Sequence, residues 1–156
     1  MYTDGSIIEL KLGAAVVCRN NNQYEQVRLS VKSEIVDAET VAIRKALEYA
    51  YDYCKPHRQI KQVIVFSDSQ SSIRKLERTD AFSSQQNVIE AHEYAKKLHD
   101  INVRTKVEWV PSHSDIQHNE IVDKLAKEAT TITDNVEDTK YVLYVKRNVR
   151  ATTRVN

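Results

Sequence analysis

Apolar and polar positions alternate in short runs through the first part of the chain. Residues 13–19 form an apolar run that stops at the polar cluster 20–23, and apolar residues occupy every second position toward the end of 24–31. Such runs are typical of strands, so the two segments predict a hairpin. Residues 1–3 are interpreted as the tail of another strand that ends before Asp4, which predicts that the sequence is part of a longer polypeptide.

Helical periodicity follows the hairpin. The segment from Asp37 to Cys54 lacks helix breakers and places apolar residues at helical spacing, with Asp37 as the expected N-cap and Pro56 just beyond the end. Gln62–Ser67 is a continuous apolar run, typical of a strand covered on both faces. The same patterns predict, further along the chain, helical segments over 71–78, 87–99 and 119–130 and a strand over 103–110.

This order of elements predicts the fold class. A hairpin followed by strands that alternate with helices implies an α/β protein with a mixed sheet covered by helices. With 41% apolar and 29% charged residues, the composition excludes a disordered chain. No repeat or linker precedes residue 131, so we expect one domain over 1–130 and a basic C-terminal appendage or linker over 131–156.

Charge and cysteine content narrow the function classes. The net charge of +1 is uninformative, but no acid follows Asp138 and the tail carries five bases. Such a tail suits a polyanion, or it is a solvated end. Two cysteines exclude a disulfide framework and a metal cage. No membrane-spanning stretch or signal peptide is found, so we expect an intracellular protein of the cytoplasm or nucleus, neither secreted nor membrane-bound. The five bases are Lys140, Lys146, Arg147, Arg150 and Arg154.

Four acidic residues occupy positions that favour a metal site. Asp4 follows the first strand fragment, Asp68 follows the strand 62–67, Glu39 lies in the first turn of a helix, and Asp123 lies within the last helix. Open α/β sheets bind ligands at the carboxyl ends of strands. Carboxylates that converge there repel one another unless a cation such as Mg²⁺, which prefers oxygen ligands, neutralises them. Two ions about 3.5–4 Å apart would suit phosphoryl transfer.

Each acid also has a structural explanation. Asp4 could be a turn residue, because Asp-Gly is a common turn dipeptide. Glu39 could favour a helix N-terminus through the helix dipole, and Asp68 could cap the helix that follows it. Asp123 could be a solvated helix position. Spacing alone leaves these alternatives open.

Four short motifs follow one another between Tyr2 and about Ala129. They are Tyr2–Ser6, Ala38–Glu39, Phe66–Gln70 and, last, Trp109–His113 with Asn119–Glu120 and Asp123–Lys127. In this order and spacing they resemble the type 1 ribonuclease H family. The resemblance implies a ribonuclease H-like fold, whose five-stranded mixed sheet has three antiparallel strands followed by parallel ones and is flanked by helices.

The resemblance also implies catalytic roles. Asp4 would bridge two Mg²⁺ ions, for which Mn²⁺ can substitute, and Asp123 would be the second ligand of the ion that activates the attacking water. Glu39 and Asp68 would bind the ion that steadies the leaving 3′ oxygen. His113 matches a mobile histidine that assists proton transfer or product release. The expected activity is endonucleolytic hydrolysis of the RNA strand of an RNA–DNA hybrid, leaving 5′-phosphate and 3′-hydroxyl ends.

Four further residues are expected to contact the hybrid. Gln70 matches a residue that touches the minor groove, and Gly5 and Ser6 lie close enough to the acids to read the 2′-hydroxyl that distinguishes RNA from DNA. Asn119 belongs to the last motif. Because contacts to sugars and phosphates carry no sequence information, sequence specificity is not expected.

The chain departs from the family pattern in several places. Ser112 and His118 stand where the family often has glycine, and Ile35–Val36 stand where many relatives have asparagines that touch the hybrid. Residues 80–86 lack a basic protrusion, which predicts weak, salt-sensitive binding. Domains without it often follow a reverse transcriptase in retroelement polyproteins, and we expect that context here. The alternatives are a non-catalytic module that binds nucleic acid or protein, a DNA nuclease of the same superfold, and a structural domain.

Overall fold

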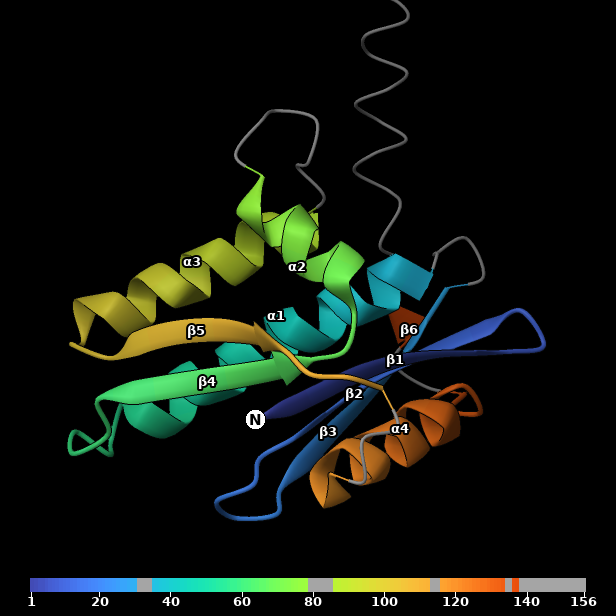
Figure 1. The fold of residues 1–156 in the computed structure, drawn as a ribbon, viewed down its shortest axis with the longest axis horizontal. Coiled ribbons are helices and arrows are strands. Elements are labelled where there is room, and N and C mark those ends of the chain that lie inside the picture. Colours follow the sequence, from blue (N-terminus) through green and yellow to red (C-terminus); the bar gives the residue numbers. More distant parts are fainter. Residues whose placement is uncertain (31–34, 79–85, 113–115, 134–135, 138–156) are drawn as a thin grey trace, which may run out of the picture.

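The computed structural model (Figure 1) describes residues 1–30, 35–78, 86–112, 116–133 and 136–137. Every segment predicted from the hydrophobic pattern between residues 13 and 130 is present, with each end within two residues of the prediction. The elements in chain order are β1 (Tyr2–Ile8), β2 (Lys11–Val17), β3 (Tyr24–Leu29), α1 (Ile35–Cys54), β4 (Gln62–Ser67), α2 (Gln70–Glu77), α3 (Gln86–Asp100), β5 (Arg104–Trp109), α4 (Gln117–Ala129) and β6 (Val136–Glu137).

The strands form one mixed sheet in the order β5-β4-β1-β2-β3-β6. β1, β2 and β3 pair antiparallel, whereas β4 runs parallel to both β1 and β5. The predicted five-stranded mixed sheet is therefore confirmed. The short strand β6 extends it by pairing parallel with the end of β3. Part of the stretch 131–156 thus joins the sheet, and its separation as a domain stays a prediction.

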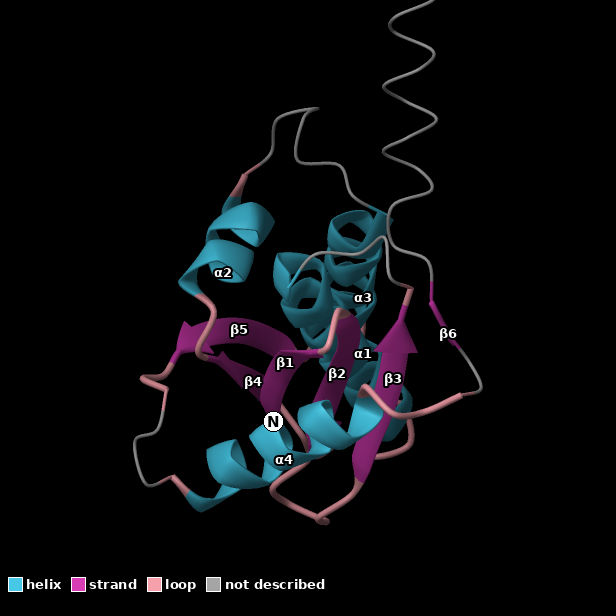
Figure 2. Ribbon diagram, turned by 90° about the vertical axis from the view of Figure 1, so that its right-hand side faces the viewer, coloured by secondary structure: helices cyan, strands magenta, loops and turns pink. Residues whose placement is uncertain are grey.

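Helices cover both faces of the sheet (Figure 2), with α1 on one face of β1 and β2 and α4 on the other. Side chains of β2 alternate between these two layers, so that Ala14 is buried in the cluster with α1 and Ala15 in the cluster with α4. A Cβ atom added at Gly13 would lie 2.7 Å from Cβ of Ala129, so glycine allows α4 to approach the strand. Burial on both faces explains the continuous apolar run.

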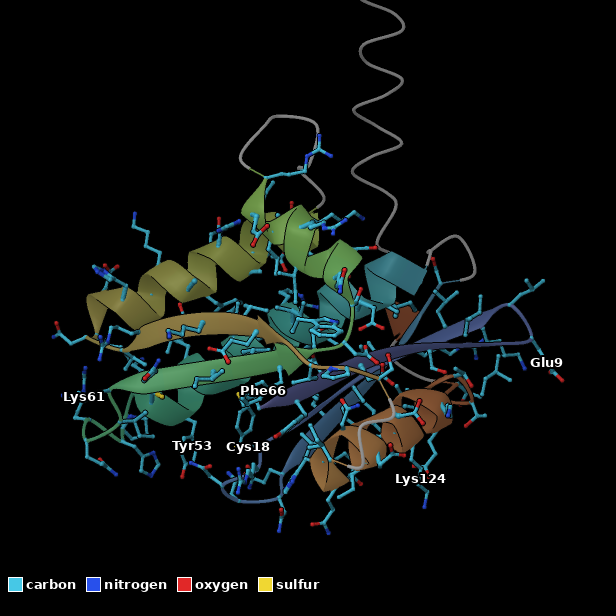
Figure 3. All side chains as sticks on the ribbon, viewed as in Figure 1. Glu9, Cys18, Tyr53, Lys61, Phe66 and Lys124 are labelled. Carbon is cyan, nitrogen blue, oxygen red and sulfur yellow. The ribbon has the colours of Figure 1, made fainter. Side chains whose placement is uncertain are left out.

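The first strand is longer than the sequence predicted. β1 extends through Asp4 and pairs with β2 from Tyr2–Val17 to Ile8–Lys11. Our expectation that the strand ends before Asp4 was wrong, and Asp4 is not a turn residue. The turn lies at Glu9, at the outer end of the hairpin (Figure 3), and at Leu10, with φ angles of 48° and 65°. The turn preference of Asp-Gly is local, and the seven-residue pairing with β2 outweighs it.

Two helix starts also differ from expectation. α1 begins at Ile35, so Asp37 lies in the first turn and is not the N-cap. α2 is capped by Ser69, whose side chain accepts a 3.3 Å hydrogen bond from the backbone N–H of Ser72. Asp68 is therefore not the cap of α2, which leaves its carboxylate available for another role. None of the helices described is long and apolar enough to cross a membrane.

Candidate active site

The pairing of β1 with β4 ends directly before two of the four acids. Thr3 and Ser67 form the last residue pair between these parallel strands, and Thr3 Oγ1 donates a 3.0 Å hydrogen bond to the carbonyl of Phe66. Asp4 is the next residue of β1, and Asp68 is the first residue after β4. The two carboxylates therefore lie beside each other where the strand order reverses, which is where open α/β sheets bind ligands.

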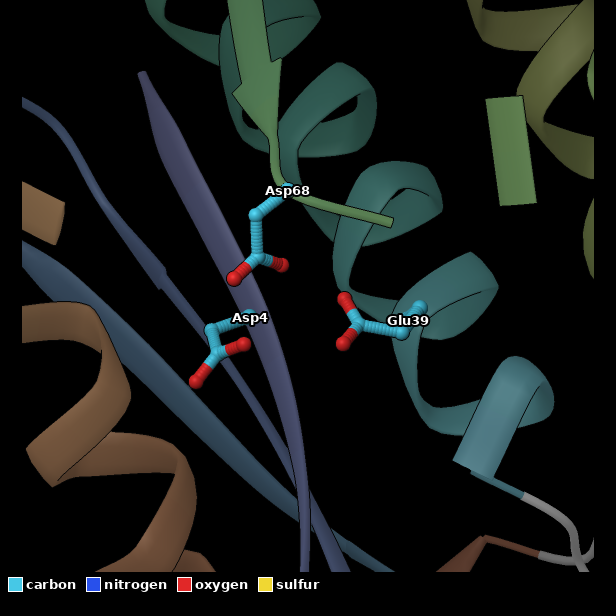
Figure 4. A group of neighbouring side chains, drawn as sticks. All are labelled: Asp4, Glu39 and Asp68. Carbon is cyan, nitrogen blue, oxygen red and sulfur yellow. The ribbon is translucent and has the colours of Figure 1, made fainter. Parts of the chain in front are cut away.

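Gly5 allows helix α1 to supply the third carboxylate. A Cβ atom added at Gly5 would lie 2.8 Å from the backbone nitrogen of Glu39 and 2.9 Å from Cβ of Ala38, too close for any other residue without movement of the helix. With glycine, α1 packs on β1 and Glu39 points at the strand edge. Oxygen atoms of Asp4, Glu39 and Asp68 all lie within 4.8 Å of one another, and Figure 4 shows the three carboxylates facing each other.

The fourth acid reaches the cluster from the other face of the sheet. Asp123 on α4 lines the same cavity as Asp4, and its charge raises the pKa of the Asp4 carboxyl group. Oδ2 of Asp123 also accepts a 2.5 Å hydrogen bond from Nζ of Lys127, one helical turn further along. Asp4 is thus close to Glu39 and Asp68 and shares the cavity with Asp123.

Burial and like charges disfavour the ionised carboxylates. Burial, with the charges of Asp68 and Asp123, raises the pKa of Asp4 to about 8. Burial, with the charges of Asp4 and Asp68, raises the pKa of Glu39 to about 9. Glu39 Oε2 is buried and makes no hydrogen bond. An orphaned oxygen within a crowded carboxylate cluster fits a bound divalent cation, because a cation would replace the protons and satisfy that oxygen.

The four carboxylates line one open cavity of about 410 Å³. The other lining residues are small or polar, and two of them, Gly5 and Asn119, were predicted to bind substrate. This mixture of hydroxyl, amide and carboxylate groups suits a polar ligand with phosphates and sugars. The remaining residues of the lining are Ser69, Ser71, Ser112 and Glu120.

Comparison with known proteins identifies the family. The sequence model of the RNase H family matches residues 1–131. The chain belongs to the ribonuclease H family. No curated protein matches the chain.

Solved structures of this family have a similar fold. RNase H1 from the halophilic archaeon Halobacterium salinarum NRC-1 is similar with a TM-score of 0.58 and 21% identity, covering 82% of this chain and 93% of the archaeal one. The N-terminal RNase H domain of a Mycobacterium tuberculosis protein, solved as a fusion with maltose-binding protein, is similar with a TM-score of 0.58 and 17% identity, covering 82% and 89%. The expected ribonuclease H-like fold is confirmed.

The remaining predicted residues of this ribonuclease H domain are placed differently. Ser6 is buried in β1 and Gln70 is exposed at the start of α2. Neither is among the residues of the described segments that line the cavity, so their contact with substrate stays a prediction. His113 lies outside the described residues.

Sequence reasoning missed the residues that hold Asp68 in place. Trp109 Nε1 donates a 3.1 Å hydrogen bond to the backbone carbonyl of Asp68, and the backbone N–H of Ser69 donates a 3.2 Å hydrogen bond to Ser67 Oγ. Ser69 could have been found, because a serine directly before a helical segment is a strong N-cap signal. The bond from Trp109 carries no local signal, because it joins the end of β5 to the end of β4.

Proposed function

We propose that this domain is an endonuclease that hydrolyses the RNA strand of RNA–DNA hybrids by a two-metal-ion mechanism, leaving 5′-phosphate and 3′-hydroxyl ends. The observation that carries the proposal is the carboxylate cluster, in which oxygens of Asp4, Glu39 and Asp68 lie within 4.8 Å of one another. Membership of the ribonuclease H family supports the substrate class. The cluster supports catalysis over a non-catalytic module of the same fold, which would not need four acids in one cavity.

The cluster fits Mg²⁺, with Mn²⁺ as a substitute, because its donors are carboxylate oxygens and one of them is buried without a partner. Asp4 would contribute to both ions, Glu39 and Asp68 to one of them, and Asp123 to the other. When bound, the pair of ions would lower the pKa of an attacking water and stabilise the charge on the leaving oxygen. The protein's part is to hold the four carboxylates at one place on the sheet.

The other residues of the cavity would bind and orient the hybrid. Asn119 is 6% exposed and lines the cavity beside Asp123, so its amide could hydrogen-bond a sugar or phosphate oxygen. Gly5 lines the cavity, so its backbone could contact a sugar at the strand edge. Gln70, exposed at the start of α2, would contact the hybrid from outside the cavity, and the buried Ser6 would contact it only through its backbone. His113 would carry a proton to or from the reacting groups.

The experiment that tests this function compares three substrates. Labelled RNA–DNA hybrid, duplex DNA and duplex RNA are incubated with the protein in the presence of Mg²⁺ and with a chelator. We expect cleavage of the hybrid alone, only with Mg²⁺, and products that carry a 5′ phosphate. Cleavage of duplex DNA at a similar rate, or a folded protein inert on all three substrates, would overturn the proposal.

We also propose that the domain belongs to a longer polypeptide with a reverse transcriptase domain, as in retroelements. The support comes from the sequence, because residues 80–86 contain one acid and no base, where some relatives have a basic protrusion. Within this stretch, 80–85 lie outside the described residues. A domain without such a protrusion would gain substrate affinity from a neighbour that already holds the hybrid. Reading the coding sequence on both sides tests the idea, and an open reading frame without a polymerase domain would exclude it.

A further inference from the structure

Three aromatic rings form a continuous stack across two strands of the sheet and helix α4. The ring of Tyr2 lies between two others, with its centroid 5.0 Å from that of Phe66 and 5.5 Å from that of His118. The interplanar angles are 29° and 21°, so both contacts are stacked. Figure 3 labels Phe66 on β4; Tyr2 lies on β1 and His118 on α4. One stack therefore joins three elements that are far apart in sequence.

In each of the two strands, the stacked ring comes two residues before a carboxylate. Tyr2 precedes Asp4 on β1, and Phe66 on β4 precedes Asp68, the first residue after that strand. Residues two apart along a strand lie on the same face. β1 and β4 are also joined by backbone pairing beside these rings, so their relative position does not depend on the stack alone.

Helix α4 lacks such backbone pairing, and its two halves are held in different ways. The C-terminal half is fastened by Gln26, whose Nε2 donates a 2.7 Å hydrogen bond to the carbonyl of Leu125, and by the close approach of Gly13 to Ala129. The N-terminal half begins at Gln117, and its N-cap residue Ile116 packs on the cluster of Tyr2 and Val122 but makes no side-chain capping hydrogen bond. His118, in the first turn, is half-buried and stacks on Tyr2.

Open space beside the N-terminal half makes this ring contact more important. A cavity of about 480 Å³ separates that part of α4 from the ends of β2 and β3, and His118 lines it together with Ile121 and Tyr24. The exposed fractions of Ile121 and Tyr24 are 40% and 60%. Packing on this side is therefore incomplete, and the helix start could pivot if the ring of His118 were removed. Asp123 follows His118 by about one and a half helical turns, so it would move with it.

We propose that His118 is a positioning residue: its stack on Tyr2 sets the spacing between Asp123 on α4 and Asp4 on β1, and thereby the affinity for the second cation. The inference rests on the proposed two-metal function. It assigns His118 an effect on one ion only, because the ring of His118 stacks on Tyr2 of β1, whereas Glu39 lies on α1 and Asp68 follows β4.

The test measures cation binding directly. Isothermal titration of the full chain with Mn²⁺ compares the wild type with His118→Ala, His118→Gln and His118→Phe, and Ile121→Ala serves as a control on the same helix. We expect two binding events in the wild type. Loss of the ring should weaken the second event by about 10-fold and leave the first unchanged, in line with other substitutions of residues that orient metal ligands. His118→Phe keeps a ring and should restore the second event.

Several outcomes would overturn the positioning role. The role is wrong if the two variants without a ring, His118→Ala and His118→Gln, bind Mn²⁺ like the wild type or weaken both binding events equally. It is also wrong if His118→Phe does not restore the second binding event, or if the wild type binds a single ion. Failure of the proposed function would look different, because the wild type would then leave the hybrid uncleaved, or Asp68→Asn would cleave it as fast as the wild type. If Asp68→Asn abolishes cleavage while the ringless variants bind Mn²⁺ normally, the function stands and the role of His118 falls.

Discussion

Lys127 donates a 2.5 Å hydrogen bond from Nζ to Oδ2 of Asp123, one turn earlier on helix α4. The hydrogen bond to Asp123, followed by nearby negative charges, raises the pKa of Lys127. The two side chains are 49% and 30% exposed, so the pair is only partly shielded from water. In the metal-free protein the ammonium group therefore occupies an oxygen that the second cation would need.

Replacing Lys127 by methionine should tighten binding of the second cation. Partly exposed ion pairs contribute about 0.2–1 kcal/mol, so removal of the competing ammonium should increase the affinity by up to about fivefold. Titration calorimetry with Mn²⁺ measures the change. Lys124→Met is the matched control. Lys124 is on the same helix, and its side chain is 78% exposed on the outside of the molecule (Figure 3). Weaker binding by Lys127→Met would mean that the lysine orients Asp123 and does not compete for it.

Asp68→Asn should abolish hybrid cleavage and leave the fold intact. The charge of Asp68 raises the pKa of both Asp4 and Glu39, so its removal relieves repulsion in the buried cluster. We therefore expect the metal-free variant to melt a few degrees above the wild type, because about 1 kcal/mol shifts the melting temperature of a domain of this size by about 2–4 °C. Glu93→Gln, which neutralises an exposed acid on α3, should change neither property. Near wild-type turnover by folded Asp68→Asn would contradict the assignment of this residue.

The stability of the metal-free protein should fall as the pH rises from 5 to 9. Unfolding returns the carboxyl groups of Asp4 and Glu39 to pKa values of 3.8 and 4.5, whereas in the folded protein these are about 8 and 9. Between these limits the folded state binds more protons than the unfolded state, so raising the pH favours unfolding. A single group that is fully protonated only when folded changes the free energy by about 1.4 kcal/mol per pH unit.

Urea unfolding at several pH values, with a chelator and then with Mg²⁺, measures this effect. The fall in stability with rising pH should be smaller when Mg²⁺ is present, because the cation favours the ionised carboxylates. In the double variant Asp4→Asn, Glu39→Gln it should disappear without Mg²⁺, since neither side chain can ionise. A stability that rises with pH in the metal-free wild type would contradict the inferred burial of these charges.

The hydrophobic pattern was enough to predict most elements but not the first strand. The run Gln62–Ser67 is apolar throughout because β4 lies inside the sheet, and its ends were predicted correctly. The predicted first strand ended too early because Asp4-Gly5, considered alone, is a turn dipeptide. Glycine is needed there for another reason, the approach of α1, and a contact between residues 34 positions apart leaves no local pattern. β6 was missed because two residues are too few for a period to appear.

The acidic part of the site was predictable, whereas the groups around it were not. Asp4, Glu39 and Asp68 were named from their places at strand ends and in a helix turn, and from the family motifs, and the structure brings them together. Ser71 and Ser112 line the same cavity, although neither was predicted to belong to the site. Small hydroxyl residues occur in many loops and helix starts, so only the folded arrangement separates those at the site from the rest.

His113→Ala should slow hybrid cleavage without erasing it. The role that the resemblance gives His113 is auxiliary. Loss of general acid–base assistance typically lowers the reaction rate by about 10²–10⁴-fold, and we expect the loss in His113→Ala to be no larger than this. Single-turnover and multiple-turnover rates of the variant separate a slower chemical step from slower product release. His99→Ala is a suitable control, because the His99 side chain is 85% exposed on α3. A loss as large as that of Asp4→Asn, with the fold intact, would show that His113 is essential.

Removing the C-terminal tail should weaken binding of the hybrid and leave the catalytic domain folded. The cut belongs after Asp138, because Val136 and Glu137 pair with β3 and an earlier cut would remove that strand. This truncation removes the five bases of the tail, which lies outside the described residues. For each phosphate that the tail no longer neutralises, the log–log dependence of binding on salt should become shallower by about 0.9, the value for duplex DNA. The single-turnover rate at saturating protein should stay unchanged.

The tail also carries the apolar run 141–145, which could instead pack on the domain or on a neighbouring one. A second variant separates the two roles by replacing the five bases with glutamine and keeping the apolar run. If the bases contact phosphates, this variant should show the shallow salt dependence of the truncated chain and the melting temperature of the wild type. If the tail is structural, truncation should lower the melting temperature while both variants keep the wild-type salt dependence. That second pattern would exclude a role of the tail in binding, because charge removal alone would then have no effect.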